Sequence, residues 1–174
     1  MEVSHTGNLL VATPQLIDPN FYRAVVLILQ HDEEGSVGVV LNRPTLERVG
    51  NHLPEWEKAT REGLVFAGGP VEPEVAIGIS SSMSGEPTGV AGLSMVDLTQ
   101  EPEESQGLTQ VYSGYSGWGP GQMEDELEMG SWYVIQASPD DPFANHEALW
   151  RDVLRRQGGH LSVVSTFSDE PELN

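Results

Sequence analysis

The sequence has 174 residues, of which 38% are hydrophobic and 20% are charged, a balance that permits one globular domain with a buried core. Eight basic residues stand against 27 acidic ones, so the net charge of −19 disfavours direct binding to nucleic-acid phosphates. The absence of cysteine excludes disulfides and thiolate chemistry, and no run approaches the roughly 18 apolar residues of a membrane span. The N-terminus has no secretory-signal pattern, and we therefore expect a soluble cytoplasmic protein without a membrane contact.

The negative charge is distributed unevenly along the chain. Residues 62–150 contain no lysine or arginine, although 15 of the 27 acidic residues lie in this stretch. A solvated acidic surface of this kind keeps a protein dissolved. The alternative is a surface that binds a basic partner or cations.

Strands dominate the first part of the chain. The apolar run over residues 8–13 predicts a buried first strand. Residues 23–30 and 36–42 are rich in β-branched side chains, and the turn at 31–35 between them predicts an antiparallel hairpin. Because both runs are continuously apolar rather than alternating, we expect both faces of the sheet to be covered.

The rest of the chain mixes short strands with a few helices. Apolar spacing predicts helices at 44–61, 121–129 and 146–156. Short strands are expected at 64–67, 75–79, 89–98, 108–116 and 131–137. Polar loops are expected at 80–87 and 100–107, and the tail 168–174 is expected to be loose. Many strands with few βαβ units indicate an α+β or barrel-like fold.

The glycine-rich segment 114–122, Gly-Tyr-Ser-Gly-Trp-Gly-Pro-Gly-Gln, is the most distinctive local feature. Its glycines allow tight turns, and a helix that begins after it offers an anion site at its N-terminus. Glu124, Asp125 and Glu126 already fill the first turn of that helix, where the helix dipole favours them. The favoured interpretation is a rigid strand-to-helix corner with Trp118 packed beneath it.

The common catalytic motifs are missing. Ser116 is not in a Gly-x-Ser-x-Gly turn, because Trp118 takes the last glycine position. The single lysine, Lys58, follows Glu57 and forms no phosphate loop, and Gln122 replaces the third glycine of a dinucleotide loop. The sequence therefore predicts no catalytic residue and no cofactor.

The five histidines have no metal-ligand spacing, so no metal site is predicted. They are His5, His31, His52, His146 and His160. His31 follows a predicted strand at a hairpin tip, where a solvated turn is expected. The alternative is an acid–base or ligand role for this imidazole.

Arg43 lies at the end of a buried strand, in Asn42-Arg43-Pro44. One interpretation pairs it with a carboxylate from the acidic middle segment. The other makes it the anion-contacting group of a pocket walled by Gly68-Gly69-Pro70 and the Trp118 corner. The candidate ligand-binding residues of that pocket are Asn42, Arg43, Gly68, Gly69, Ser116, Trp118 and Gln122.

Taken in order, six motifs resemble the bacterial YqgE/AlgH family over a match from about residue 7 to the C-terminus. These motifs are Gly7-x-Leu9-Leu10-x-Ala12-x-Pro14, Phe21-x-Arg23-Ala24-Val25-Val26, Gln30-His31-Asp32-x-x-Gly35, Gly38-Val39-Val40-Leu41-Asn42-Arg43-Pro44, Gly68-Gly69-Pro70-Val71 and Gly114-Tyr115-Ser116-Gly117-Trp118-Gly119-Pro120-Gly121-Gln122-Met123-Glu124. The resemblance implies a single α+β domain over 1–174, whose mixed, bifurcated sheet contains a barrel-like part and is flanked by a few helices. It carries over no catalytic residue. The family's second name comes from a proposed role in regulating alginate synthesis genes, which implies a transcriptional regulator that acts indirectly.

Taken together, these features favour a non-enzymatic regulatory or partner-binding protein that contacts a protein partner. Such a protein needs an exposed apolar or acidic patch. The alternative is a small-ligand binder or enzyme that uses a cleft near Arg43, Gly69 and Trp118. That alternative needs a pocket with convergent polar groups.

A regulator that binds DNA directly is disfavoured by the charge. It would need its few cations to gather in space. The required cluster would join Arg151, Arg155 and Arg156 with Arg43 or Arg48.

Overall fold

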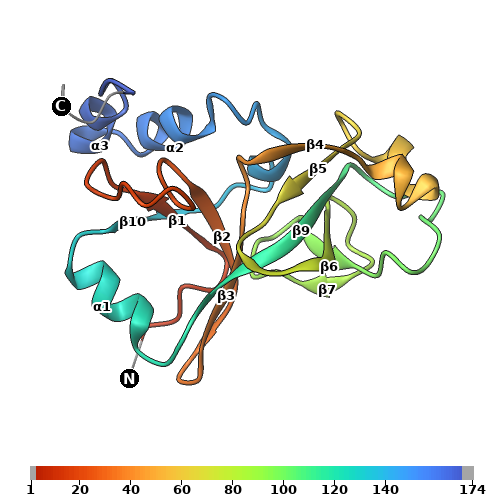
Figure 1. Ribbon diagram of the computed structural model, residues 1–174, viewed down its shortest axis with the longest axis horizontal. Helices are drawn as coiled ribbons and strands as arrows, with labels where there is room; N and C mark the ends of the chain where they lie inside the picture. The colour runs from red at the N-terminus through yellow and green to blue at the C-terminus, as the bar shows by residue number, and fades with distance from the viewer. Residues whose placement is uncertain (1–2, 170–174) are drawn as a thin grey trace.

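The computed structural model describes residues 3–169, which form a curled, half-barrel sheet with a few helices around it (Figure 1). The strands follow the order β10-β1-β2-β3-β9-β6-β8-β7, and β5 joins β4 to the side of β9. The first half of the sheet contains β1 (Asn8–Ala12), β2 (Val25–Asp32), β3 (Gly35–Val40) and β10 (Trp132–Gln136). The predicted hairpin of β2 and β3 is confirmed, with Val26 opposite Val40 and Asp32 opposite Gly35.

The long strand β9 (Thr109–Trp118) belongs to both halves of the sheet. Its end pairs with β3, and its earlier residues pair with the second half, so the sheet divides along this strand (Figure 1). The second half contains β4 (Pro44–Arg48), β5 (Leu64–Ala67), β6 (Val71–Ser80), β7 (Glu86–Pro87) and β8 (Ser94–Val96). The α+β class and the bifurcated sheet are confirmed.

The helices cover the first half of the sheet from two sides. These helices are α1 (Gln122–Glu128), α2 (Leu149–Gln157) and α3 (Gly159–Val164). Figure 1 shows α2 and α3 on one side of β1, β2 and β10, with α1 on the other side. Three short 3-10 helices complete the fold: η1 (Val49–Asn51), η2 (Pro54–Ala59) and η3 (Asp141–Phe143). Within residues 3–169, no helix is long and apolar enough to cross a membrane.

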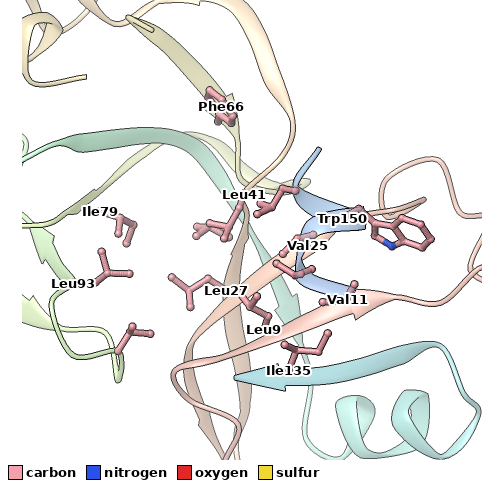
Figure 2. Close-up of a cluster of buried hydrophobic side chains, with 14 of the residues drawn as sticks. Leu9, Val11, Val25, Leu27, Leu41, Phe66, Ile79, Leu93, Ile135 and Trp150 are labelled. Carbon is pink, nitrogen blue, oxygen red and sulfur yellow. The ribbon is translucent and has the colours of Figure 1, made fainter. Parts of the chain in front are cut away.

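Alternate residues of β1 and β2 enter two different cores, which explains their continuously apolar sequences. Leu9, Val11, Val25 and Leu27 face α2 and the second half of the sheet, together with Trp150 (Figure 2). The second core, on the α1 side, contains Leu10, Ala12, Ala24, Val26, Ile28, Val40, Trp118, Met123 and Trp132. A third, smaller cluster lies beneath η1 and η2 and contains Val49, Trp56, Val65, Leu98 and Val111.

The helix predicted over 44–61 is wrong. Residues 44–48 form strand β4, and two 3-10 helices follow it. The helical spacing depended on Leu46, but that side chain is 99% exposed. Thr45 instead donates its hydroxyl to Val65 O at 2.6 Å, which ties this segment to β5. Two prolines in the segment further restrict a continuous helix.

Candidate functional site

Arg23, Arg43 and Arg151 are three of the eight cations in the sequence, and they line one hollow of about 220 Å³, which we call the arginine hollow. Its complete lining is Arg23, Asn42, Arg43, His146, Glu147, Trp150, Arg151 and Asp169. These residues come from the start of β2, the connection between β3 and β4, the start of α2 and the segment after α3. The site therefore depends on the packing of four chain segments that are distant in sequence.

Asn42 fixes the backbone on one side of this hollow. Its side chain is buried, with Oδ1 accepting from Val25 N at 3.0 Å and Nδ2 donating to Arg23 O at 2.9 Å. Arg23 has a φ of 54°, a left-handed conformation that residues with a Cβ seldom adopt. Asn42 therefore acts as a positioning residue that holds Arg23 in an otherwise unfavourable conformation.

Trp150 forms the rigid floor of the hollow. Its ring is 3% exposed, and Nε1 donates to Ala12 O at 2.9 Å. The guanidinium carbon of Arg23 lies 4.2 Å from the ring centroid, and that of Arg151 lies 5.9 Å away. Both arginines are thus oriented by cation–π contacts with one buried aromatic ring.

A carboxylate of the chain itself occupies the space between two of these arginines. Asp169 Oδ1 accepts from Arg23 Nη1 and from Arg151 Nη2, each at 2.9 Å. Tyr22 donates its hydroxyl to Asp169 O at 2.5 Å, and Arg23 donates to Phe167 O at 3.1 Å. Arg23, Arg151 and Tyr22 therefore bind both the side chain and the backbone of an acidic segment. Asp169 belongs to the tail that is expected to be loose, of which residues 170–174 lie outside the described part.

Arg43 adds a third, partly buried positive charge. Its guanidinium donates to Tyr22 O. Burial lowers the pKa of Arg43, because desolvation disfavours the charged form, yet guanidinium groups remain charged at neutral pH. Since Glu147 and Asp169 are the carboxylates of the lining, three positive charges face two negative ones. The hollow is locally cationic in a protein that is strongly acidic overall.

The remaining predicted site residues lie in other surroundings. Ser116 donates its hydroxyl to Gly68 O at 3.1 Å, and Gly69 packs against the backbone of β9 at Tyr115. These residues therefore join strands. The structure brings Asn42 and Arg43 together at the arginine hollow.

Trp118 and Gln122 form the strand-to-helix corner. Trp118 is 5% exposed within the α1-side core, and its Nε1 donates to Glu126 Oε1 at 3.2 Å. Trp132 Nε1 donates to the same oxygen at 3.0 Å, and Gln122 Oε1 accepts from Gly119 N at 3.0 Å. The packed corner is thus the observed role of this segment. Trp118 also borders a shallow hollow with Gln30 that is separate from the arginine hollow.

The sequence did not indicate Arg23, Trp150 and Asp169 as parts of this site. It named Arg151 beside Arg43 only as part of the cation cluster that DNA binding would need, and the structure brings these two arginines to the same hollow. Arg23 was assigned only to the beginning of the strand predicted over 23–30, and Trp150 lies within the helix predicted over 146–156. The hairpin could have indicated part of the site. Arg23 precedes β2 and Arg43 follows β3, so the antiparallel pairing of these strands brings two of the eight cations of the sequence close together.

His31 is buried instead of lying in a solvated turn. Its side chain is 3% exposed, and Nδ1 accepts from His5 N at 2.9 Å. A backbone N–H can only donate, so the proton of the neutral ring lies on Nε2, which is 2.6 Å from Glu124 Oε1. Both ring nitrogens are thus engaged, and the His5 ring stacks on His31 with centroids 5.4 Å apart. This arrangement ties the N-terminal segment to α1 and leaves no nitrogen of His31 for a ligand.

Acid is expected to weaken the fold through His5. Burial is the largest cause that lowers the pKa of His5 below its ordinary value of 6.5, and the neighbouring His31 adds to it. In the unfolded chain this group takes up its proton at higher pH than in the folded protein. The free energy of unfolding should therefore fall as the pH decreases below about 6.5.

Urea denaturation at several pH values, followed by circular dichroism, checks this expectation. His5→Gln should have a flatter dependence between pH 7 and pH 5 than the natural chain. The matched control is His160→Gln, which removes an exposed imidazole from α3. The pKa of Glu124 is also lowered, first through its own backbone N–H and then through His31. Protonation of Glu124 therefore weakens the fold only at pH values below about 4.5, outside the range compared here. Equal slopes for the natural chain and His5→Gln would contradict the prediction.

The chain is similar to proteins of one bacterial family over nearly its whole length. A family model described as AlgH-like matches residues 9–162. A UPF0301 protein of Streptomyces coelicolor is 52% identical over 98% of this chain and 96% of its own length. A UPF0301 protein of Thermobifida fusca is 41% identical over 99% of this chain and 96% of its own length.

Two solved structures have the same fold. The crystal structure of a Corynebacterium diphtheriae protein is 32% identical, with a TM-score of 0.81 over 96% of this chain and 94% of that chain. The solution structure of the AlgH protein from Pseudomonas aeruginosa has a TM-score of 0.72 and 23% identity, covering 98% of this chain and 97% of that one, which shows a shared fold. On the family model and the 52% identical relative, the chain belongs to the AlgH-like family.

Proposed function

We propose that this chain is a non-enzymatic, partner-binding regulatory protein that recognises an acidic segment of a protein partner in the arginine hollow. The observation that carries this proposal is the position of the Asp169 carboxylate, 2.9 Å from both Arg23 and Arg151. The Asp169 carboxylate thus shows the kind of group that these two arginines can bind. A partner aspartate or glutamate takes the same position when Asp169 leaves it.

The chemistry of the hollow suits this ligand. Guanidinium groups match carboxylates through charge-assisted hydrogen bonds, and Trp150 fixes their direction. The bonds from Tyr22 and Arg23 to backbone carbonyls favour a peptide segment over a free anion. Glu147 keeps the local charge excess small, which favours a single carboxylate in the hollow.

Other charges of the molecule support a protein ligand over duplex DNA. Arg155 pairs with Asp152 at 3.1 Å, and Arg156 pairs with Asp141 at 2.8 Å, so neither is a free phosphate contact. At physiological salt, charges further than about 8 Å away are strongly screened. The local arginines therefore attract a carboxylate although the protein as a whole carries −19.

Fluorescence anisotropy with a labelled Thr-Phe-Ser-Asp-Glu peptide, copied from residues 166–170, tests the proposal. The natural chain should bind it weakly, because Asp169 competes at a high effective concentration. Asp169→Asn should bind about tenfold more tightly, since it weakens the competitor, and Arg151→Gln at least tenfold more weakly. The matched control Asp125→Asn removes the same charge from an exposed position of α1 and should leave the affinity unchanged.

Two outcomes would contradict this function. Unchanged affinity in both Asp169→Asn and Arg151→Gln would place the peptide elsewhere. Displacement of the peptide by sub-millimolar succinate would instead favour the small-ligand alternative, because succinate has carboxylates but no peptide carbonyls.

A further inference from the structure

A second hollow of about 330 Å³ lies in the other half of the sheet, and we call it the apolar groove. Its floor contains Val65 of β5 and Val111 of β9, and one wall contains Val49 and Leu53. The opposite wall is formed by residues 73–76 of β6. The groove shares no lining residue with the arginine hollow and plays no part in the proposed function.

The groove is built by two irregular strand segments. β4 pairs with β5 at Pro44 opposite Phe66 and at Arg48 opposite Leu64, and the register shifts between these pairs. The register of β6 against β9 likewise shifts between Val71 and Ala76. Bulged residues leave the plane of a sheet, so the two segments rise on either side of the β5–β9 floor. The groove is therefore a feature of the backbone.

The walls present apolar surface to a ligand. The hydroxyl of Thr45 is already bonded to Val65 O, and that of Ser113 donates to Pro73 O. These two polar groups of the lining are thus satisfied within the protein. Val75 is 39% exposed at the wall, so its apolar surface is available to a ligand.

The rim is acidic. Glu47 and Glu74 are both exposed at the edge of the groove. Glu47 lies 3.2 Å from His52, whereas Glu74 makes no ion pair with any residue in the described range 3–169. Arg48, which follows Glu47 in β4, is paired with Glu57 at 2.7 Å. The apolar floor and the acidic rim together match a ligand with an apolar side chain next to a cation.

We propose that the apolar groove docks a segment of a partner protein in which a leucine-sized side chain is followed directly by lysine or arginine. The apolar side chain covers Pro73, Val75 and Ala76, which are the exposed apolar residues of the lining, and the cation lies between Glu47 and Glu74. Burial of one such side chain contributes enough for weak, reversible binding, and the rim charges select against acidic sequences. This surface has the opposite charge preference to the arginine hollow.

Fluorescence anisotropy of the full chain with a labelled Ser-Leu-Arg-Leu-Lys-Ser peptide tests the proposal. Two matched peptides, Ser-Leu-Glu-Leu-Glu-Ser and Ser-Ser-Arg-Ser-Lys-Ser, separate the charge requirement from the apolar one. We expect binding of the first peptide and at least tenfold weaker binding of the other two. The double variant Glu47→Lys/Glu74→Lys changes only exposed side chains and should weaken binding of the first peptide at least tenfold.

Two control variants test whether the peptide binds at the apolar groove. Glu128→Lys reverses an exposed charge on α1 and should weaken binding less than twofold. Arg151→Gln should leave this affinity unchanged, so failure of the proposed function and failure of the groove are distinguishable. Equal binding of Ser-Ser-Arg-Ser-Lys-Ser would show attraction by charge alone and overturn the proposal. An unchanged affinity in the double glutamate variant would overturn it as well.

Discussion

Gly69→Ala is expected to destabilise the protein by about 3 kcal/mol or more, which is a large part of the stability of a typical domain. A Cβ on this residue would lie 2.2 Å from both the carbonyl carbon and the oxygen of Tyr115, and 2.4 Å from Ser116 N. These are backbone atoms of the central strand β9, so they cannot move without displacing the sheet. The φ of 156° adds conformational strain for any residue with a side chain. Urea denaturation followed by far-ultraviolet circular dichroism measures the loss.

Gly117→Ala is the matched control for this prediction. Gly117 lies in β9, the strand whose backbone Gly69 approaches, but its added Cβ would have its nearest heavy atoms at 3.9 and 4.0 Å, which is ordinary contact. The residue is exposed, and alanine restricts the unfolded chain more than glycine. We expect a change within about 1 kcal/mol, in the stabilising direction. Similar urea midpoints for Gly69→Ala and Gly117→Ala would show that the close contact at Gly69 does not contribute to stability.

The glycine pair at 68–69, which the sequence offered as a pocket wall, has a structural role. Gly68 N donates to Ser113 O at 2.9 Å, and Gly68 O accepts from Val40 N at 2.9 Å. One residue after β5 thus bonds to both β3 and β9, at the place where the sheet divides. The absence of side chains lets three strands approach each other here.

Local signals were sufficient for much of the sheet and for the Trp118 corner. Continuous β-branched runs with a glycine-ended turn predict β2 and β3, because β-branched residues favour strands and a short turn between two such runs favours a hairpin. The corner follows from acidic residues at the start of α1 and from glycines that permit the turn before it. Its energetic basis, the bonds from Trp118 and Trp132 to Glu126, needs contacts across the fold and was not predictable.

The failures have a common physical cause. The apolar spacing of 44–61 fits a helix, but pairing with β5 decides the conformation of Pro44–Arg48. Helix α3 begins at Gly159, directly after the Gly158 that ends α2, and this glycine pair gave no sign of a new helix. The arginine hollow depends on residues 128 positions apart, such as Arg23 and Arg151, so only the tertiary packing of α2 reveals it. In each case a contact between distant segments outweighs the local preference.

Asn42→Ala is expected to destabilise the protein by about 3 kcal/mol and to weaken binding of the acidic peptide. The substitution leaves Val25 N and Arg23 O without their bonds of 3.0 and 2.9 Å, and an unsatisfied buried polar group costs about 1–3 kcal/mol. It also releases the backbone of Arg23 from the conformation that directs its guanidinium over Trp150.

Urea denaturation gives the first effect, and anisotropy with Thr-Phe-Ser-Asp-Glu at a temperature where the variant remains folded gives the second. Asn20→Ala, at an exposed position, should change stability by less than about 0.5 kcal/mol. A folded Asn42→Ala protein with undiminished peptide affinity would mean that Asn42 stabilises the fold without positioning Arg23. Loss of affinity in the folded variant, together with its recovery when Asp169→Asn is added, would show that Asn42 and Asp169 act on the same guanidinium from opposite directions. Asn42 positions the guanidinium of Arg23, and Asp169 competes with the peptide for it.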